Sequence, residues 1–283
     1  MEVVPHADAG AFTRLARPLL EADPLRHTSV LTVLDSVRRG ASTPADMLTV
    51  RDGDAVVGAL LRTVDRPALV SGVPPRCAAA VVDALVELGI DPHGAQGPRA
   101  AAEAFAAAWT ARTAARTEIV MRTRLFALEE LMPRVGVPGS SRVVAPDDEA
   151  AIGVLAAWRE AFGVEMGHGG AFAEQRPHAL VRAQAATAGE LLWEVDGAPV
   201  AQAAARAVTA GMSRIGPVYT PPEHRGHGYA AAVTAAAARW ALDHGARHVL
   251  LYTDLANPTT NRLYPRLGFR PRYDALELRF VPG

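Results

Sequence analysis

The sequence predicts an α/β protein of two domains. Its 283 residues exceed the usual size of one domain and suit two domains of about 140 residues, each large enough to bury a core. Two similar hairpin-like segments, one in each half, indicate an internal duplication. In the second half, stretches typical of strands and of helices alternate, which is the order of a mixed α/β fold. We therefore predict a sheet flanked by helices in each half.

The hairpin signals are the dipeptides Asp52-Gly53 and Asp196-Gly197, each of which lies between two apolar runs. Asp-Gly between apolar runs is a strong local signal for a β-hairpin. A Pro-Pro pair follows each hairpin at a similar separation, at Pro74-Pro75 and at Pro221-Pro222. This shared order of turns supports the duplication.

An alanine-rich helix is predicted after each Pro-Pro pair, over residues 76–88 and 225–244. Gly89 and Gly245 follow these helices, and glycine just past a helix end is typical of a left-handed cap. A second helix is predicted to begin at Pro98 in the first half and at Pro258 in the second, because proline suits the first helical position.

Residues 133–141 are rich in proline and glycine and have little apolar pattern, so we predict a linker there. The predicted domains are then residues 1–132 and 142–283. In the second domain the predicted order is strand 142–145, helices 147–163 and 172–187, strands within 191–220, a helix, strand 247–253, a helix, and strands within 269–281. Along the helix from residue 225, one face with Tyr229, Val233, Ala236 and Trp240 is expected to pack on the sheet.

Composition excludes several classes of protein. The chain has 29 Lys plus Arg against 30 Asp plus Glu, so no global field favours nucleic acid or a membrane surface. Its one cysteine, Cys77, cannot form an internal disulfide or a thiolate metal site, which fits a reducing cytosol. The start lacks the pattern of a signal peptide and no apolar run is long enough to span a membrane. We expect a cytoplasmic protein that binds no metal. The sequence leaves open whether the chain forms a homodimer.

A glycine turn connects a predicted strand, residues 215–220, to the helix that follows it. The turn reads Arg225-Gly226-His227-Gly228-Tyr229-Ala230. Glycines allow close approach of an anion and let successive N–H groups point at one place. The unpaired amides and the dipole at the helix N-terminus then favour phosphate oxygens. The turn lacks the Gly-Lys-Ser/Thr of a mononucleotide P-loop and the third glycine of a dinucleotide site.

This turn resembles motif A of the GCN5-related N-acetyltransferase (GNAT) family, Arg/Gln-x-x-Gly-x-Gly/Ala, through Arg225, Gly228 and Ala230. The resemblance implies two GNAT-like domains, each with a mixed, mostly antiparallel sheet flanked by helices, and acetyl-CoA as acyl donor. Pro217 cannot donate to a ladder, so its strand should be splayed from a neighbour. In the family this gap receives the pantetheine arm, next to the backbone of Val218, Tyr219 and Thr220. A solvated helix start is the alternative role for Arg225.

A second signature, Asn257-x-x-x-Asn261-x-x-Tyr264-x-x-x-Gly-Phe, matches the same family. Asn257 is typical of an N-cap, and the three side chains project along one side of a short helix. The family's tyrosine acts as general acid toward the departing CoA thiolate, so Tyr264 is the expected acid and Asn257 is expected near the thioester. Pro265 should kink this helix. Capping alone for Asn257 and a core role for Tyr264 are the alternatives.

The resemblance therefore implies these cofactor-binding residues: Val218, Tyr219, Thr220, Arg225, Gly226, His227, Gly228, Tyr229, Ala230, Asn257, Asn261 and Tyr264. Glu223 is a candidate base, with a plain loop carboxylate as the alternative. Glu165 and His168 lie in a glycine-rich connection that lines the acceptor pocket in related enzymes, and we expect them there. A surface loop is the alternative for His168.

The first half lacks glycines at the equivalent turn, Pro74-Pro75-Arg76-Cys77, and is expected to be a degenerate domain that does not bind CoA well. The chain is thus predicted to be an acetyl-CoA-dependent N-acetyltransferase acting on a small-molecule or peptide amine, which attacks the thioester directly. Two other functions stay open: a CoA-binding regulatory or structural module without turnover, and transfer of a different acyl group.

Overall fold

The computed structural model describes residues 1–40, 42–166 and 177–283. The chain forms two compact units. Unit 1 comprises Met1–Leu125, Asp254–Ala256 and Arg272–Gly283, and unit 2 comprises Phe126–Thr253 and Asn257–Pro271. The predicted division at residues 133–141 differs from these units, because residues 272–283 belong to unit 1 and the segment 133–139 belongs to unit 2.

Unit 1 begins with β1 (Glu2–Pro5), α1 (Ala9–Ala22), α2 (Thr28–Arg38), and the hairpin of β2 (Pro44–Asp52) and β3 (Ala55–Thr63). It continues with β4 (Ala68–Leu69), the short 3₁₀ helix η1 (Pro75–Cys77), α3 (Ala78–Glu87), β5 (Gly94–Pro98), α4 (Arg99–Arg112) and most of β6 (Ala115–Leu128). Strands β1 to β4 pair antiparallel in sequence order, and β4 pairs parallel with β5.

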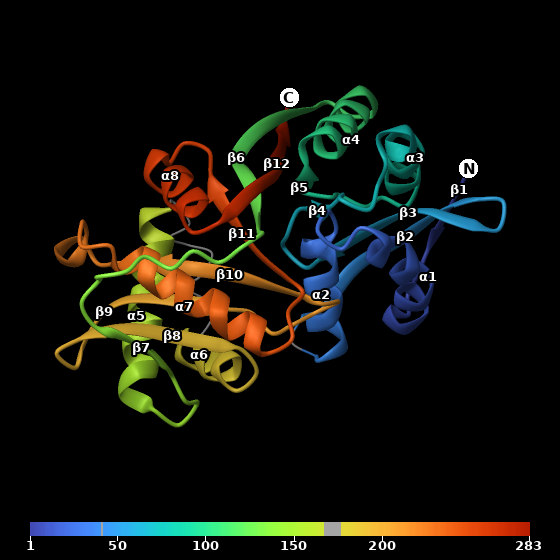
Figure 1. Ribbon diagram of the computed structural model, residues 1–283. Coiled ribbons are helices and arrows are strands. Elements are labelled where there is room, and N and C mark those ends of the chain that lie inside the picture. The colour runs from blue at the N-terminus through green and yellow to red at the C-terminus, as the bar shows by residue number, and fades with distance from the viewer. Residues whose placement is uncertain (41, 167–176) are drawn as a thin grey trace. The chain divides into compact units, whose positions relative to one another are not determined.

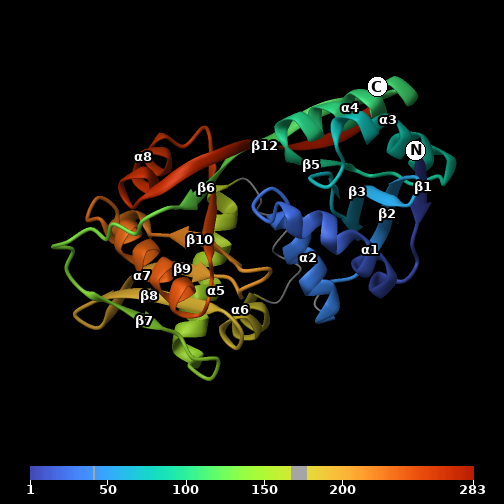
Figure 2. The same cartoon turned by 45° about the vertical axis from the view of Figure 1, so that its right-hand side comes forward.

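The last strand of the chain completes the sheet of unit 1. Strand β12 (Phe269–Pro282) pairs antiparallel with β5, from Ala275 opposite Pro98 to Arg279 opposite Gly94. Figure 2 shows the red β12 running beside β5. Leu276 and Leu278 are buried in the core of unit 1, together with residues of α3 and α4.

Unit 2 contains β7 (Ser140–Val143), α5 (Glu149–Glu165), α6 (Pro177–Ala185), β8 (Gly189–Val195), β9 (Ala198–Ala205) and β10 (Met212–Tyr219). The 3₁₀ helix η2 (Pro222–His224), α7 (Tyr229–Asp243), β11 (His248–Asp254) and α8 (Pro258–Arg266) follow. Strands β7 to β10 pair antiparallel in sequence order, and β10 pairs parallel with β11.

Both units therefore share an antiparallel run that ends in a parallel pair, which agrees with the predicted duplication. Both Asp-Gly dipeptides form the predicted hairpin turns, and Gly89 and Gly245 have the positive φ predicted at the helix ends. Asn257 caps α8 with Pro258 at the first position, whereas Pro98 itself is the residue before α4. The predicted start of the helix at residue 172 lies outside the described residues, and β7 begins two residues before its predicted start.

Helices cover both faces of the unit 2 sheet (Figure 1). Leu191 of β8 packs in the cluster with α7, and its neighbour Leu192 packs in the cluster with α5 and α6. The predicted packing face of α7 is confirmed in part. Val233 is fully buried and Tyr229, Ala236 and Trp240 are partly buried against the core, but the fully buried positions also include Ala237, Ala238 and Ala241. Alanines carry too little contrast in hydrophobicity to reveal this broader face.

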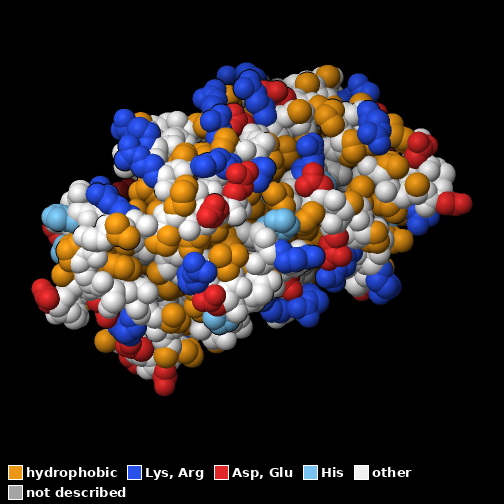
Figure 3. Space-filling model, in the orientation of Figure 1, with side chains coloured by type: hydrophobic (Ala, Val, Ile, Leu, Met, Phe, Trp, Pro, Cys, Tyr) orange, Lys and Arg blue, Asp and Glu red, His pale blue; other side chains and the backbone are white. Residues whose placement is uncertain are grey.

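Among the described residues, no helix is long and apolar enough to cross a membrane. No group of three or more His, Cys, Asp and Glu side chains in the described ranges could hold a metal ion. Basic and acidic side chains are interspersed on the face drawn in Figure 3, which is consistent with the formal net charge of −1.

Candidate functional site

The glycine turn lies between β10 and α7 in unit 2. Gly226 and Gly228 have φ of 86° and 87°, in the left-handed region that favours glycine. The helix consequently begins at Tyr229 and not at the predicted Arg225, because left-handed residues cannot continue a right-handed helix. Gly226 and His227 are exposed, Gly228, Tyr229 and Ala230 are half-buried, and the His227 ring stacks on Tyr229.

Consecutive backbone N–H groups of this turn have no backbone partner in the described parts of the chain. The first helical hydrogen bond of α7 runs from the N–H of Ala232 to the carbonyl of Gly228, at 3.1 Å. Among the described residues, the N–H groups from Gly226 to Ala231 make no backbone hydrogen bond. Such a series at a helix N-terminus, where the dipole is positive, suits an anion with several oxygens.

A guanidinium group lies beside the same turn. A Cβ placed on Gly228 would meet Nη1 of Arg134 at 3.2 Å and Cγ2 of Val137 at 3.4 Å. Arg134 is exposed and has no ion-pair partner in the part of the chain that the structure describes. No sequence pattern singles it out, because it is one arginine of many and lies in the segment predicted as a linker. That segment instead packs on unit 2, where the carbonyl of Pro138 accepts a hydrogen bond from the indole of Trp193.

Strand β10 leaves its neighbour before the turn. It pairs with β11 only from Met212 to Ile215, where Ile215 lies opposite Leu251. Its register with β9 shifts between Ile215 and Val218, and Pro217 lies within the shift. The predicted splaying at Pro217 is thus confirmed. At Val218 and Tyr219, the side of β10 that faces β11 has no strand partner in the described sheet.

Arg225 and Glu165 form an ion pair next to the turn. Nη2 of Arg225 lies 2.8 Å from both carboxylate oxygens of Glu165, and its Nε donates to the carbonyl of Thr220 at 2.9 Å. The hydroxyl of Tyr219 donates to Glu165 at 3.1 Å. The structure therefore brings a predicted acceptor-site residue into contact with two predicted cofactor residues. Glu165 ends α5, and His168 lies outside the described residues.

Aromatic rings and unpartnered polar groups surround Tyr219. Trp158 and Phe162 of α5 lie with ring centroids 6.3 and 6.5 Å from that of Tyr219. Burial, followed by the neighbouring Glu165 carboxylate, raises the pKa of the Tyr219 phenol. Opposite Tyr219 on β9, Gln202 is 1% exposed and its amide has no hydrogen-bond partner among the described residues. The sequence offers no signal for Gln202, since a glutamine in an alanine-rich strand looks solvent-facing.

Helix α8 carries the second predicted group. The side-chain oxygen of Asn257 accepts the N–H groups of Thr259 and Thr260, at 3.1 and 3.2 Å, so the predicted cap is confirmed. Asn261 donates to the carbonyl of Asn257 at 2.8 Å and accepts from Thr253 of β11 at 2.6 Å. These bonds fix the start of α8 against β11. The helix continues through Pro265 to Arg266.

Tyr264 is buried in the core of unit 2. The residue is 6% exposed and belongs to the hydrophobic cluster that also contains Ile215 and Leu251, the last paired residues of β10 and β11. Phe269 packs against it edge-on at 6.0 Å. Burial raises the pKa of its phenol to about 12. Glu223, by contrast, is an exposed carboxylate in η2.

Comparisons with known proteins agree with this arrangement. Residues 155–269 match the family model described as the acetyltransferase (GNAT) family. The chain resembles a GCN5-related N-acetyltransferase from Kribbella flavida, with 22% identity and a TM-score of 0.55 over 90% of this chain and 95% of that one. It also resembles a tandem GNAT protein from the clavulanic acid biosynthesis pathway, with 20% identity and a TM-score of 0.58 over 99% and 98%.

A third structure, a GCN5-related N-acetyltransferase from Sphaerobacter thermophilus, has 19% identity and a TM-score of 0.58 over 99% of this chain and 96% of that one. None of the curated proteins compared matches the sequence. The likeness over nearly the whole chain shows the fold: two GNAT-like units in tandem.

Proposed function

We propose that this chain, whose residues 155–269 match the model of the acetyltransferase (GNAT) family, transfers an acetyl group from acetyl-CoA to an amine. The observation that carries the proposal is the series of free N–H groups from Gly226 to Ala231, placed directly after the point where β10 leaves β11. A diphosphate fits the turn, since Gly226 has no atom within 4 Å of the position that a Cβ would take. The open strand edge beside it fits an extended amide-bearing chain.

The protein's own groups have separable tasks in this proposal. The amides of the turn and Arg134 bind the diphosphate, and the backbone of Val218 and Tyr219 orients the pantetheine arm. Acetyl-CoA supplies an acetyl group activated as a thioester. Tyr264 holds a proton at its hydroxyl for the departing sulfur, because a phenol with a raised pKa stays protonated at neutral pH.

The acceptor amine is proposed to enter on the side of α5. Glu165 lies there, and its carboxylate is already bonded to Arg225 and Tyr219, so it can anchor a cation but is not free to act as a base in this arrangement. The unpartnered amide of Gln202 and hydroxyl of Thr220 are further polar groups at this place. Buried polar groups without partners are costly, and a bound molecule would supply the missing hydrogen bonds.

A pair of glycine variants tests the cofactor site. Gly226 and Gly245 stand before and after the same helix, have φ of 86° and 88°, and each have open space around the Cβ position. Gly226→Val and Gly245→Val should therefore share the backbone strain, but only the first should block the amides. We expect the Kd for acetyl-CoA, measured by calorimetry, to rise about tenfold or more in Gly226→Val and to stay unchanged in Gly245→Val. Equal affinities in both variants would overturn the site.

Turnover is tested by the release of free thiol from acetyl-CoA over a panel of polyamine, peptide and aromatic amine acceptors. Acceptor-dependent release supports the transferase. Tight acetyl-CoA binding with no release from any acceptor would favour a binding module. Replacing acetyl-CoA by other acyl-CoA thioesters in the same assay identifies the acyl group.

A further inference from the structure

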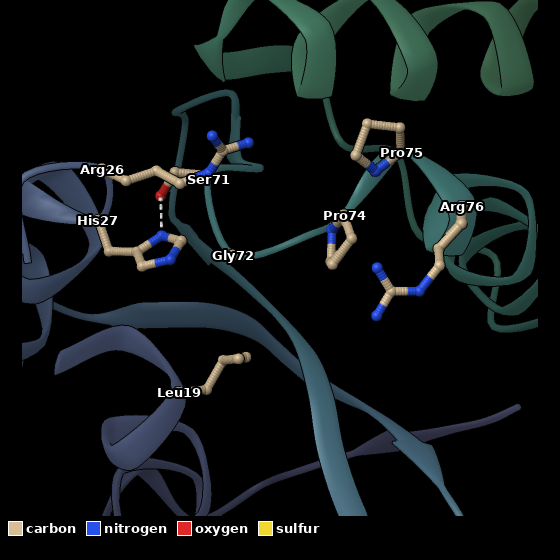
Figure 4. Close-up of a pocket in the computed structure, with 8 residues that line it drawn as sticks. All are labelled: Leu19, Arg26, His27, Ser71, Gly72, Pro74, Pro75 and Arg76. Carbon is tan, nitrogen blue, oxygen red and sulfur yellow. Dashed lines mark hydrogen bonds between the residues drawn. The ribbon is translucent and has the colours of Figure 1, made fainter. Parts of the chain in front are cut away.

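Unit 1 contains a pocket of about 310 Å³ that the proposed reaction does not use. It is lined by Arg26 and His27, which lie between α1 and α2, by Ser71 after β4, and by Pro74 and Arg76 at the start of η1. Figure 4 shows these side chains around one space, with Leu19 on its lower side. Pockets that bind small molecules begin at about this size, so a small ligand fits.

The pocket has the same place in unit 1 as the candidate site has in unit 2. In both units it lies where the first strand of the parallel pair ends, before the next helix. In unit 1, Arg26 and His27 from the α1–α2 connection also line it. The backbone differs at this place. Pro74 and Pro75 have no N–H, and the N–H of Cys77 is bonded to the carbonyl of Pro74 at 2.8 Å. A diphosphate cradle of free amides is therefore absent here, and an anion has to be held by side chains.

Two guanidinium groups supply positive charge. Arg26 and Arg76 both line the pocket, and neither has an ion-pair partner among the described residues. Among the described residues that line the pocket there is no carboxylate, although that of Asp23 acts on His27 from nearby. Arg76 is exposed, so the pocket reaches solvent on its side. Guanidinium groups recognise carboxylates and phosphates through paired, charge-assisted hydrogen bonds.

A buried polar pair faces the same space. His27 and Ser71 are 7% and 5% exposed, and Nδ1 of His27 lies 3.3 Å from the hydroxyl of Ser71. Burial lowers the pKa of His27 to about 4, against the opposing effect of the Asp23 carboxylate and with a smaller contribution from Arg26, so at neutral pH the ring is uncharged. A neutral imidazole and a hydroxyl can donate to or accept from a ligand without adding charge. Leu19 and Pro74 leave room for an apolar part of that ligand.

We propose that this pocket binds a small molecule carrying one carboxylate or phosphate group, held between Arg26 and Arg76 with Ser71 and His27 as hydrogen-bond partners. Unit 1 is then a ligand-binding domain with a chemistry different from that of unit 2. This proposal is independent of the acetyl-transfer function, because it concerns residues of unit 1 alone.

The test uses the full-length chain labelled with ¹⁵N-histidine. Inorganic phosphate and propionate are titrated separately, and the ring signals of His27, assigned with His27→Gln, report occupancy of the pocket. Arg26→Ala and Arg76→Ala are compared with Arg66→Ala, which removes an exposed arginine of unit 1 outside the pocket. We expect saturable shifts of His27 with at least one of the two anions, and a Kd about tenfold or more higher in each pocket variant but unchanged in Arg66→Ala.

Saturation by phosphate alone or by propionate alone identifies the anionic group and supports the site. The proposal is overturned if neither anion moves the His27 signals up to 50 mM, roughly the weakest useful affinity, or if Arg66→Ala weakens binding as much as Arg76→Ala. A titration with acetyl-CoA in the wild-type protein and in Gly226→Val separates the two sites. If acetyl-CoA shifts the His27 signals in the wild type and its apparent affinity falls in Gly226→Val, the signals report on the turn of unit 2 and the proposal is overturned.

Discussion

Tyr264 shows how burial limits the chemistry of one side chain. A phenolate in an apolar cluster lacks the water that would stabilise its charge, so the protonated form is favoured and the pKa rises to about 12. The same surroundings would also penalise a free thiolate, whose ordinary pKa is about 8.5. In the proposed reaction, the pKa values of the proton donor and of the leaving thiol would therefore both be raised.

Replacing Tyr264 by phenylalanine removes the proton and keeps the ring that packs on Phe269. We expect turnover to fall roughly a hundredfold or more, with the Kd for acetyl-CoA unchanged within about twofold. Thiol release and calorimetry measure the two quantities. If affinity drops while turnover per bound cofactor is retained, the assignment of Tyr264 as proton donor is wrong.

The pH profile of the wild-type protein provides a second check on Tyr264. Because the raised pKa keeps the phenol protonated, turnover should show no falling limb from this group between pH 7 and pH 10, and loss should begin only as the pH nears about 12. A falling limb near pH 9 that disappears in Tyr264→Phe would contradict the buried phenol.

At the scale of elements, the sequence predicted the turns and helix ends that depend on a few neighbouring residues. The Asp-Gly hairpins, the cap at Asn257 and the glycine stop at Gly245 each depend on a few neighbouring residues, and each was predictable. The start of α7 was misplaced because two glycines can open a turn or begin a helix. The segment with Arg134 was predicted as a linker because its packing partner, Gly228, is distant in the sequence.

The contact of that segment with the turn gives a prediction. Arg134→Ala should raise the Kd for acetyl-CoA about tenfold and reduce its dependence on salt, since a charged group near the phosphates is lost. Arg239→Ala, which removes an exposed arginine on α7, is the matched control. Calorimetry at low and high salt with CoA and with dephospho-CoA shows which phosphate Arg134 contacts. Unchanged affinity for both would remove Arg134 from the site.

At the scale of the molecule, each half contributes a strand to the core of the other unit. Phe126, at the end of β6, packs in the core of unit 2, and Leu276 and Leu278 of β12 pack in the core of unit 1. No pattern along the sequence reveals this exchange, because an alternating apolar strand fits either sheet equally well. The duplication was therefore predictable, whereas the assignment of the last strand was not.

Leu278→Ala should consequently destabilise unit 1, although residue 278 follows all of unit 2 in the sequence. A buried leucine replaced by alanine costs roughly 2–5 kcal/mol. Hydrogen exchange read by mass spectrometry should show faster exchange in β5 with little change in β9. Arg279→Ala, at the exposed neighbouring position, should leave both strands unaffected. Faster exchange in β9 than in β5 would contradict the placement of β12.

The return of β12 to β5 also sets an order for maturation on the ribosome. Residues 275–279 emerge after every residue of unit 2 has been made. The sheet of unit 1 thus keeps an unpaired edge at β5 from the time residue 98 is made until these last residues follow. A nascent chain stalled short of these residues would leave the sheet of unit 1 without its last strand.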